Sequence, residues 1–163
     1  IAGLKTEVLK TRETLQKTFG QLKIVWNHVT KCGVRHTQDI KTKEVALGQV
    51  EYVNKIKAIS THPSLRTSST NNEAGHELHQ LYMSLLGAVA YTTIMRPDAI
   101  VYVCALQRFN HKPLIIHVKR LNALTRWLQR RPRGLRYRRL SAQSDRGEML
   151  YHLIMSSDAA FKK

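Results

Sequence analysis

Acidic residues are scarce in this sequence. Its 163 residues include 27 lysines and arginines against 11 aspartates and glutamates, which gives a formal net charge of +16 at pH 7. An excess of this size destabilises a compact isolated chain by self-repulsion and favours a polyanionic partner. Nucleic acid is the first candidate for that partner, and an anionic membrane surface is the second.

Cysteines and long apolar runs are also rare. The only two cysteines, Cys32 and Cys104, cannot form a disulfide framework, and Cys104 lies in an apolar helical segment. We therefore expect buried, reduced thiols and an intracellular protein, with the compartment left open. No run of about 18 apolar residues is present, which argues against a membrane-spanning helix. The sequence starts without methionine, so we expect a fragment or a processed product.

Apolar residues at helical spacing dominate the second half of the chain. They predict a first helix that ends before Arg96-Pro97-Asp98, because proline disfavours helical backbone for the residue before it. Pro97 then starts a second helix, and a third follows Pro113. The predicted inward residues are Leu78, Leu81, Tyr82, Leu85, Leu86, Val89 and Thr92 in the first helix, Ile100, Val103, Leu106 and Phe109 in the second, and His117, Val118, Leu121, Leu124, Thr125 and Leu128 in the third.

The first half of the chain predicts shorter elements. Gly20 is a plausible end for an amphipathic helix over residues 1–19, and a polar stretch from 60 to 76 predicts an exposed, mobile linker. Alternating apolar residues predict strands. Together these patterns predict an α+β chain that is helix-rich in its second half, with short antiparallel strands near both ends. The expected strands cover residues 22–29, 34–38, 45–47, 135–140 and 149–155, and a short helix is expected at 49–59.

The segment 81–109 resembles the pattern YRSLIGSLLYLTxTRPDIxxAVxxLSRF, which follows the polymerase active site in copia-type retrotransposon polyproteins. The agreeing residues are Tyr82, Ser84, Leu85, Gly87, Tyr91, Arg96, Pro97, Asp98, Val103, Leu106, Arg108 and Phe109. The resemblance implies the end of a palm and the start of a thumb at residues 1–59, a linker at 60–76, a connection-like segment at 77–140, and the first strand of a truncated ribonuclease H domain at 141–163.

That family combines an RNA-directed DNA polymerase with a ribonuclease H, but this sequence has no Tyr-x-Asp-Asp turn to hold the catalytic Mg²⁺ ions. Asp158 matches the first ribonuclease H carboxylate, and its partners would follow Lys163. We therefore expect no catalysis and no cofactor in this chain, although Mg²⁺ is implied for a complete enzyme. The implied role is to grip a template–primer duplex.

The strongest functional signal is a stretch of the sequence that contains basic residues but no acidic ones. No acidic residue lies between Asp98 and Asp145, and guanidinium groups suit phosphate oxygens. Trp127 and Tyr137 are candidates for stacking on bases. These features predict contact with RNA, DNA or an RNA–DNA hybrid, whereas scattered charges usually form only a solvated surface. The basic tract consists of Lys119, Arg120, Arg126, Arg130, Arg131, Arg133, Arg136, Arg138 and Arg139.

Three weaker alternatives stay open. His28, Cys32 and His36 are spaced by four residues, but a turn at Gly33 separates them and zinc needs a fourth ligand. A basic chain without an active site is also compatible with a retroelement-derived structural subunit of a ribonucleoprotein, such as a ribosome. An accessory role in a membrane complex has only the positive charge in its favour.

Overall fold

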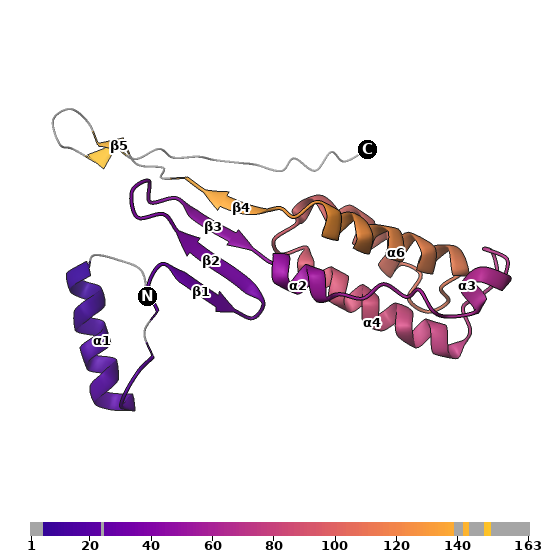
Figure 1. Ribbon diagram of the computed structural model, residues 1–163, viewed down its shortest axis with the longest axis horizontal. Helices are drawn as coiled ribbons and strands as arrows, with labels where there is room; N and C mark the ends of the chain where they lie inside the picture. The colour runs from indigo at the N-terminus through magenta and orange to yellow at the C-terminus, as the bar shows by residue number, and fades with distance from the viewer. Residues whose placement is uncertain (1–4, 24, 139–141, 144–148, 151–163) are drawn as a thin grey trace, which may run out of the picture.

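The computed structural model describes residues 5–23, 25–138, 142–143 and 149–150. A four-stranded antiparallel sheet lies beside a cluster of helices, which confirms the expected mixture of helices and short antiparallel strands (Figure 1). The helices are α1 Lys5–Phe19, α2 Val50–Lys55, α3 Ser64–Thr67, α4 His76–Thr92, the 3₁₀ helix η1 Pro97–Ala99, α5 Ile100–Gln107 and α6 Ile115–Arg130. The strands are β1 His28–Lys31, β2 Val34–Gln38, β3 Val45–Gly48, β4 Gly134–Tyr137, β5 Ala142–Gln143 and β6 Met149–Leu150.

The sheet has the order β1-β2-β3-β4, so the last strand joins the three from the first half of the chain. Cys32 and Gly33 form the β1–β2 turn with φ angles of 50° and 72°, as a two-residue hairpin requires. The expected strand at residues 22–29 is wrong for most of its length. Asn27 has a left-handed φ of 62°, which interrupts extended backbone just before β1 begins.

The C-terminal part of the sequence is only partly described. The strand expected at 135–140 is confirmed as the edge strand β4, although it already ends at Tyr137. The strand expected at 149–155 contributes its first two residues to β6, which pairs with β5. Its remaining residues lie outside the described ones.

Helices α2, α4, α5 and α6 share one apolar core. All six residues predicted to face inward from α6 are buried, because its charged residues fall on the opposite side of a regular helix. The predictions for Leu81, Ile100 and Phe109 are wrong, since these side chains are exposed. Leu81 lies at the edge of the buried stripe of α4. Ile100 is the first residue of α5 and Phe109 follows its last turn, so both lie away from the buried Val103 in the middle of that helix.

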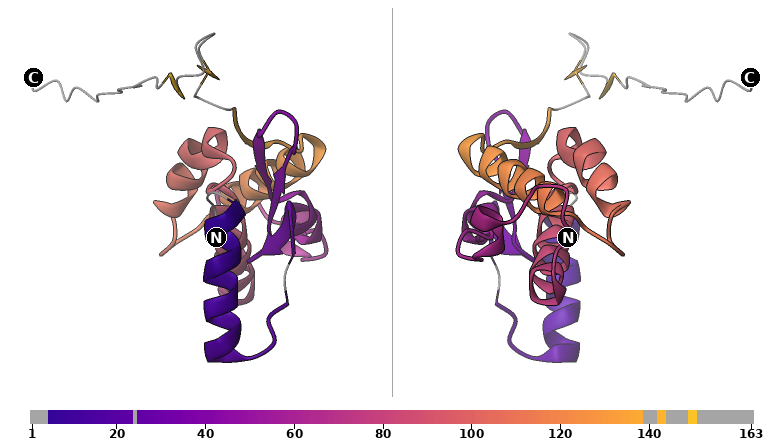
Figure 2. Two further views of the ribbon diagram at one scale, coloured as in Figure 1. Left: turned by 90° about the vertical axis from the view of Figure 1, so that its left-hand side faces the viewer. Right: turned by 90° about the vertical axis from the view of Figure 1, so that its right-hand side faces the viewer.

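The two cysteines are free, as expected, but both are exposed rather than buried. Cys32 lies at the tip of the β1–β2 hairpin. Cys104 lies in α5, which packs only part of its surface against the core (Figure 2). The same figure shows α5 on one side of the α4–α6 pair, with α2 and α3 on the other.

The segment from 60 to 76 is more structured than its polar composition predicts. It contains α3, and its carbonyl groups at Thr70 and Asn72 accept hydrogen bonds from the N–H groups of Ile116 and Ile115 at 3.0 and 2.9 Å. These bonds satisfy backbone donors at the first turn of α6, which have no partner within the helix. The domain boundaries drawn at 59, 76 and 140, from the polar composition of the linker and from the resemblance, stay a prediction.

His117 is a buried titratable group in the helical core. Its buried ring stacks on Phe109, and its Nδ1 accepts a hydrogen bond from the N–H of Leu114 at 3.0 Å. Burial first, and then the charge of Arg120, lowers the pKa of His117 below its usual 6.5. The unfolded state therefore binds the proton more readily, so this group removes stability as the pH falls below about 6.5.

We expect urea unfolding midpoints to drop between pH 7.5 and 5.5, and to drop less in His117→Gln, which keeps a hydrogen-bond acceptor but does not titrate. The other seven histidines are the same in both proteins. Equal pH dependence in the two proteins would show that His117 does not contribute.

Candidate nucleic-acid interface

The basic tract begins on the exposed side of α6. Lys119, Arg126 and Arg130 are spaced by seven and four residues, which places them on one stripe of the helix, and all three are exposed. Arg120 is also exposed, but it lies on a neighbouring stripe and lines a groove between α5 and α6. The structure therefore separates Arg120 from the other basic side chains of this helix.

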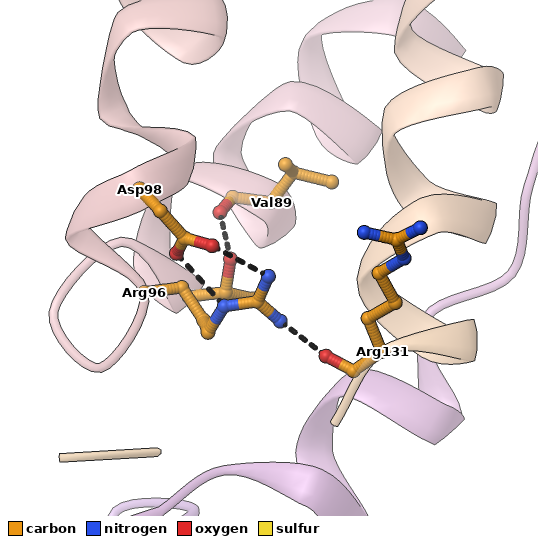
Figure 3. A network of polar contacts seen from close by, with 5 residues as sticks. Val89, Arg96, Asp98 and Arg131 are labelled. Atoms are coloured by element: carbon orange, nitrogen blue, oxygen red, sulfur yellow. Dashed lines mark hydrogen bonds and ion pairs between the residues drawn. The ribbon is translucent and has the colours of Figure 1, made fainter. Parts of the chain in front are cut away.

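A buried arginine fixes the point at which α6 ends. The Arg96 guanidinium donates to both carboxylate oxygens of Asp98 at 2.9 Å and to the carbonyl oxygen of Arg131 at 2.7 Å (Figure 3). It also lies 4.8 Å from the ring centroid of Trp127. The hydrogen bond from Arg96 holds the pKa of Asp98 below its usual value. This cluster, which we call the Arg96 latch, ties the start of the 131–133 turn to the α4–α5 corner.

The turn carries Arg131 and Arg133 in exposed positions and leads directly into β4. On β4, Arg136 and the following Arg138 are exposed as well. Arg139 lies outside the described residues. Eight of the nine predicted tract residues are thus described and exposed, and those from Arg130 to Arg138 follow one another along a helix end, a turn and an edge strand.

A groove of about 410 Å³ crosses one face of the sheet beside this turn. Its floor contains small residues: Ala46 lies within β3, Gly48 is the last residue of β3, and Gly134 is the first residue of β4. The β3 and β4 backbones approach so closely that a Cβ atom at Gly134 would collide with the carbonyl of Leu47, whereas a Cβ at Gly48 would meet open space. The lining residues are Thr30, Gly33, Arg35, Thr37, Ala46, Leu47, Gly48, Val50, Glu51, Pro132, Arg133, Gly134, Leu135 and Arg136.

Three arginines border this groove, which we call the sheet groove. Arg133 and Arg136 belong to the predicted tract, and Arg35 comes from β2. Arg35 has a carboxylate oxygen of Glu51 at 3.8 Å, and Arg136 has one of Glu44 at 3.6 Å. Ion pairs as exposed as these are weak, so a phosphate can compete for either guanidinium.

Sequence reasoning missed Arg35, because it lies outside the acid-free stretch of residues 99–144 from which the basic tract was recognised. The signal lies in the strand pairing: Arg35 pairs with Gly48, which pairs with Gly134, and the residues of such a row share one face of a sheet. That pairing depends on a strand from the far end of the chain and is not visible in the local pattern.

The two aromatic candidates for base stacking, unlike Arg133 and Arg136, do not lie at the sheet groove. Trp127 is half-buried against the core, has Arg96 over its ring, and lines the groove between α5 and α6. Tyr137 is exposed, but it follows Arg136 on the strand and therefore lies on the other face of the sheet. Neither ring lines the sheet groove.

The weak metal hypothesis finds no support in the described part of the chain, where no three His, Cys, Asp or Glu side chains come together to hold an ion. His28 pairs with Thr37 and His36 with Val29, so the two imidazoles lie on opposite faces of the hairpin. Asp158, the candidate ribonuclease H carboxylate, lies outside the described residues.

Comparisons with known proteins add no assignment. No protein-family model matches the chain, and searches of curated proteins and of solved structures find no significant similarity. Among the helices that the structure describes, none combines the length and the apolar character needed to cross a membrane.

Proposed function

We propose that this chain is a non-catalytic nucleic-acid-binding segment that grips a duplex through α6, the 131–133 turn and β4. The observation that carries the proposal is the succession of exposed arginines from Arg130 to Arg138 along a helix end, a turn and an edge strand, of which Arg133 and Arg136 line the sheet groove. Arginine forks bind phosphate oxygens in pairs, and backbone contacts of this kind require no sequence reading. The similarity of residues 81–109 to a retrotransposon segment supports a template–primer duplex as the ligand.

The sheet groove gives this proposal a specific geometry. A floor without large side chains lets a sugar–phosphate backbone approach the sheet closely, and the bordering arginines can then contact successive phosphates. The Arg96 latch supports the arrangement, because it fixes the carbonyl of Arg131 where the turn begins. Recognition would therefore depend on shape and charge rather than on base edges.

Binding of the free chain to a short RNA·DNA hybrid, measured by fluorescence anisotropy over a range of salt concentrations, tests the proposal. We expect the logarithm of the association constant to fall with the logarithm of salt with a slope of roughly −4, as several phosphate contacts require. In Gly48→Val, a side chain rises from the groove floor into open space, and we expect about tenfold weaker binding with unchanged folding, since valine suits a strand.

The role of the sheet groove and the duplex-gripping function can be overturned separately. If salt-dependent binding is identical in wild type and Gly48→Val, the basic tract is kept as the proposed binding surface and the sheet groove is excluded from it. Absence of salt-dependent binding to hybrid, duplex DNA and duplex RNA alike would overturn the duplex-gripping function. The ribonucleoprotein-subunit alternative would gain support if the native chain co-purified stoichiometrically with one large assembly and the free chain bound no isolated duplex.

A further inference from the structure

Helix α5 carries apolar residues on every side, although only one side meets the core. Its sequence IVYVCALQ has no charged residue, and Val103 and Leu106 face inward. Val101 and Tyr102 are 71% and 59% exposed. A helix that is apolar all round is typical of a buried position, so this surface points to a partner that covers it.

The exposed side of α5 borders a groove of about 560 Å³ shared with α6. From α5, Tyr102 and Ala105 line it, followed by Phe109 just past the helix end, at spacings of three and four residues. From α6, Arg120, Ala123 and Trp127 line it at the same spacings. Two facing stripes with this periodicity, with alanines between aromatic walls, are the geometry that receives a third helix.

The charges of the residues around the groove indicate which kind of helix it can receive. No carboxylate occurs from residue 99 to residue 144, so neither helix that forms the groove carries a negative charge. Arg108 and Arg120 are exposed at or near the groove. Aromatic and arginine side chains of this kind dominate the binding energy of protein interfaces.

We infer that the α5–α6 groove docks an amphipathic helix of a partner protein that presents an apolar stripe flanked by carboxylates. A second copy of this chain does not fit, because each copy carries a charge of +16. The chain's own residues 151–163 fit poorly, because they contain one carboxylate and two lysines. A nucleic-acid strand fits less well, because Arg120 is the one basic side chain among the residues that line the groove, whereas binding a strand takes several phosphate contacts.

The test uses the full chain with p-benzoylphenylalanine in place of Ala123, and two synthetic helical peptides. Both peptides carry leucine at every third or fourth position, and glutamate fills the remaining positions in one peptide and lysine in the other. By fluorescence anisotropy we expect the glutamate peptide to bind at least about tenfold more tightly. We expect Ala123→Glu to weaken that binding about tenfold, while Met83→Glu on exposed α4 surface changes it less than about twofold.

Irradiation should attach the glutamate peptide to residue 123. Attachment of residue 123 to the chain's own residues 151–163, to a second copy of the chain or to an RNA·DNA hybrid, in each case in place of the peptide, would overturn the inference. Equal binding of both peptides, or equal loss in Ala123→Glu and Met83→Glu, would also overturn it. The result is independent of duplex binding, because the sheet groove and this groove share no lining residue.

Discussion

Replacing Arg96 by methionine should lower the free energy of unfolding by about 2–3 kcal/mol, less than the 3–5 kcal/mol typical of a fully buried pair because Asp98 is partly solvated. Methionine fills similar space but loses both bonds to Asp98, the bond to the Arg131 carbonyl and the contact with Trp127. Urea denaturation of the variant and wild type at pH 7 measures the difference. Arg66→Met, on exposed α3 surface, is the matched control and should change stability by less than about 0.5 kcal/mol.

Two further measurements distinguish the latch from simple packing. Arg96→Lys keeps the charge but cannot bond two carboxylate oxygens and a carbonyl in one plane, so we expect most of the loss to remain. Because the hydrogen bond lowers the pKa of Asp98 in the folded state, the stability that it contributes is present above about pH 4 and is lost as the pH falls further. The difference in the free energy of unfolding between wild type and Arg96→Met should become smaller below pH 4. A difference that stays constant with pH would contradict the ion-pair explanation.

The sequence predicts the elements whose burial is regular. Helix α6 follows a single period, with Leu121 and Leu128 inward and Arg126 outward, and the structure agrees at every predicted inward position. Strand β2 was predicted with its observed bounds, because a turn at Cys32-Gly33 and a polar loop after Gln38 limit it on both sides. Local signals suffice where both the pattern and its ends are local.

Predictions failed where distant residues decide the structure. The helix expected to reach Ile59 ends at Lys55, and the backbone N–H and C=O groups of Ile59 bond instead to the side chain of Asn122 at 2.8 and 2.7 Å. In α5, a run without charged residues contains no polar period from which the exposed side could be read. The place of Arg35 in the lining of the sheet groove depends on β4 completing the sheet, which no local window of the sequence contains.

The largest functional effect is expected from reversing three charges of the tract. The triple variant Arg130→Glu, Arg131→Glu, Arg133→Glu should bind an RNA·DNA hybrid on the order of 100-fold more weakly at low salt, because three phosphate contacts become repulsions. The salt slope should become shallower by roughly 2 to 3, since each lost phosphate contact removes about 0.9. Anisotropy titrations at several salt concentrations measure both quantities.

A second triple variant controls for the change in net charge. Lys10→Glu, Lys17→Glu and Lys23→Glu alter the total charge equally, but they lie on α1 and the segment after it, on the β1 side of the sheet rather than the β4 side (Figure 1). We expect this control to keep a nearly wild-type slope, because screened charges farther away than about 10 Å contribute little at 0.1 M salt. Unfolding curves of both variants should also be compared, since Arg133 lies close enough to Asp98 to affect its pKa.

The pair of variants separates local contact from general attraction. If the salt slope becomes shallower only in the tract variant, the arginines from Arg130 to Arg133 contact phosphates directly. If both variants lose affinity equally, the chain attracts nucleic acid only through its total charge, and the tract is not an interface. Because the slope counts contacts whereas the affinity at one salt concentration also includes long-range attraction, the slope is the quantity that decides between these outcomes.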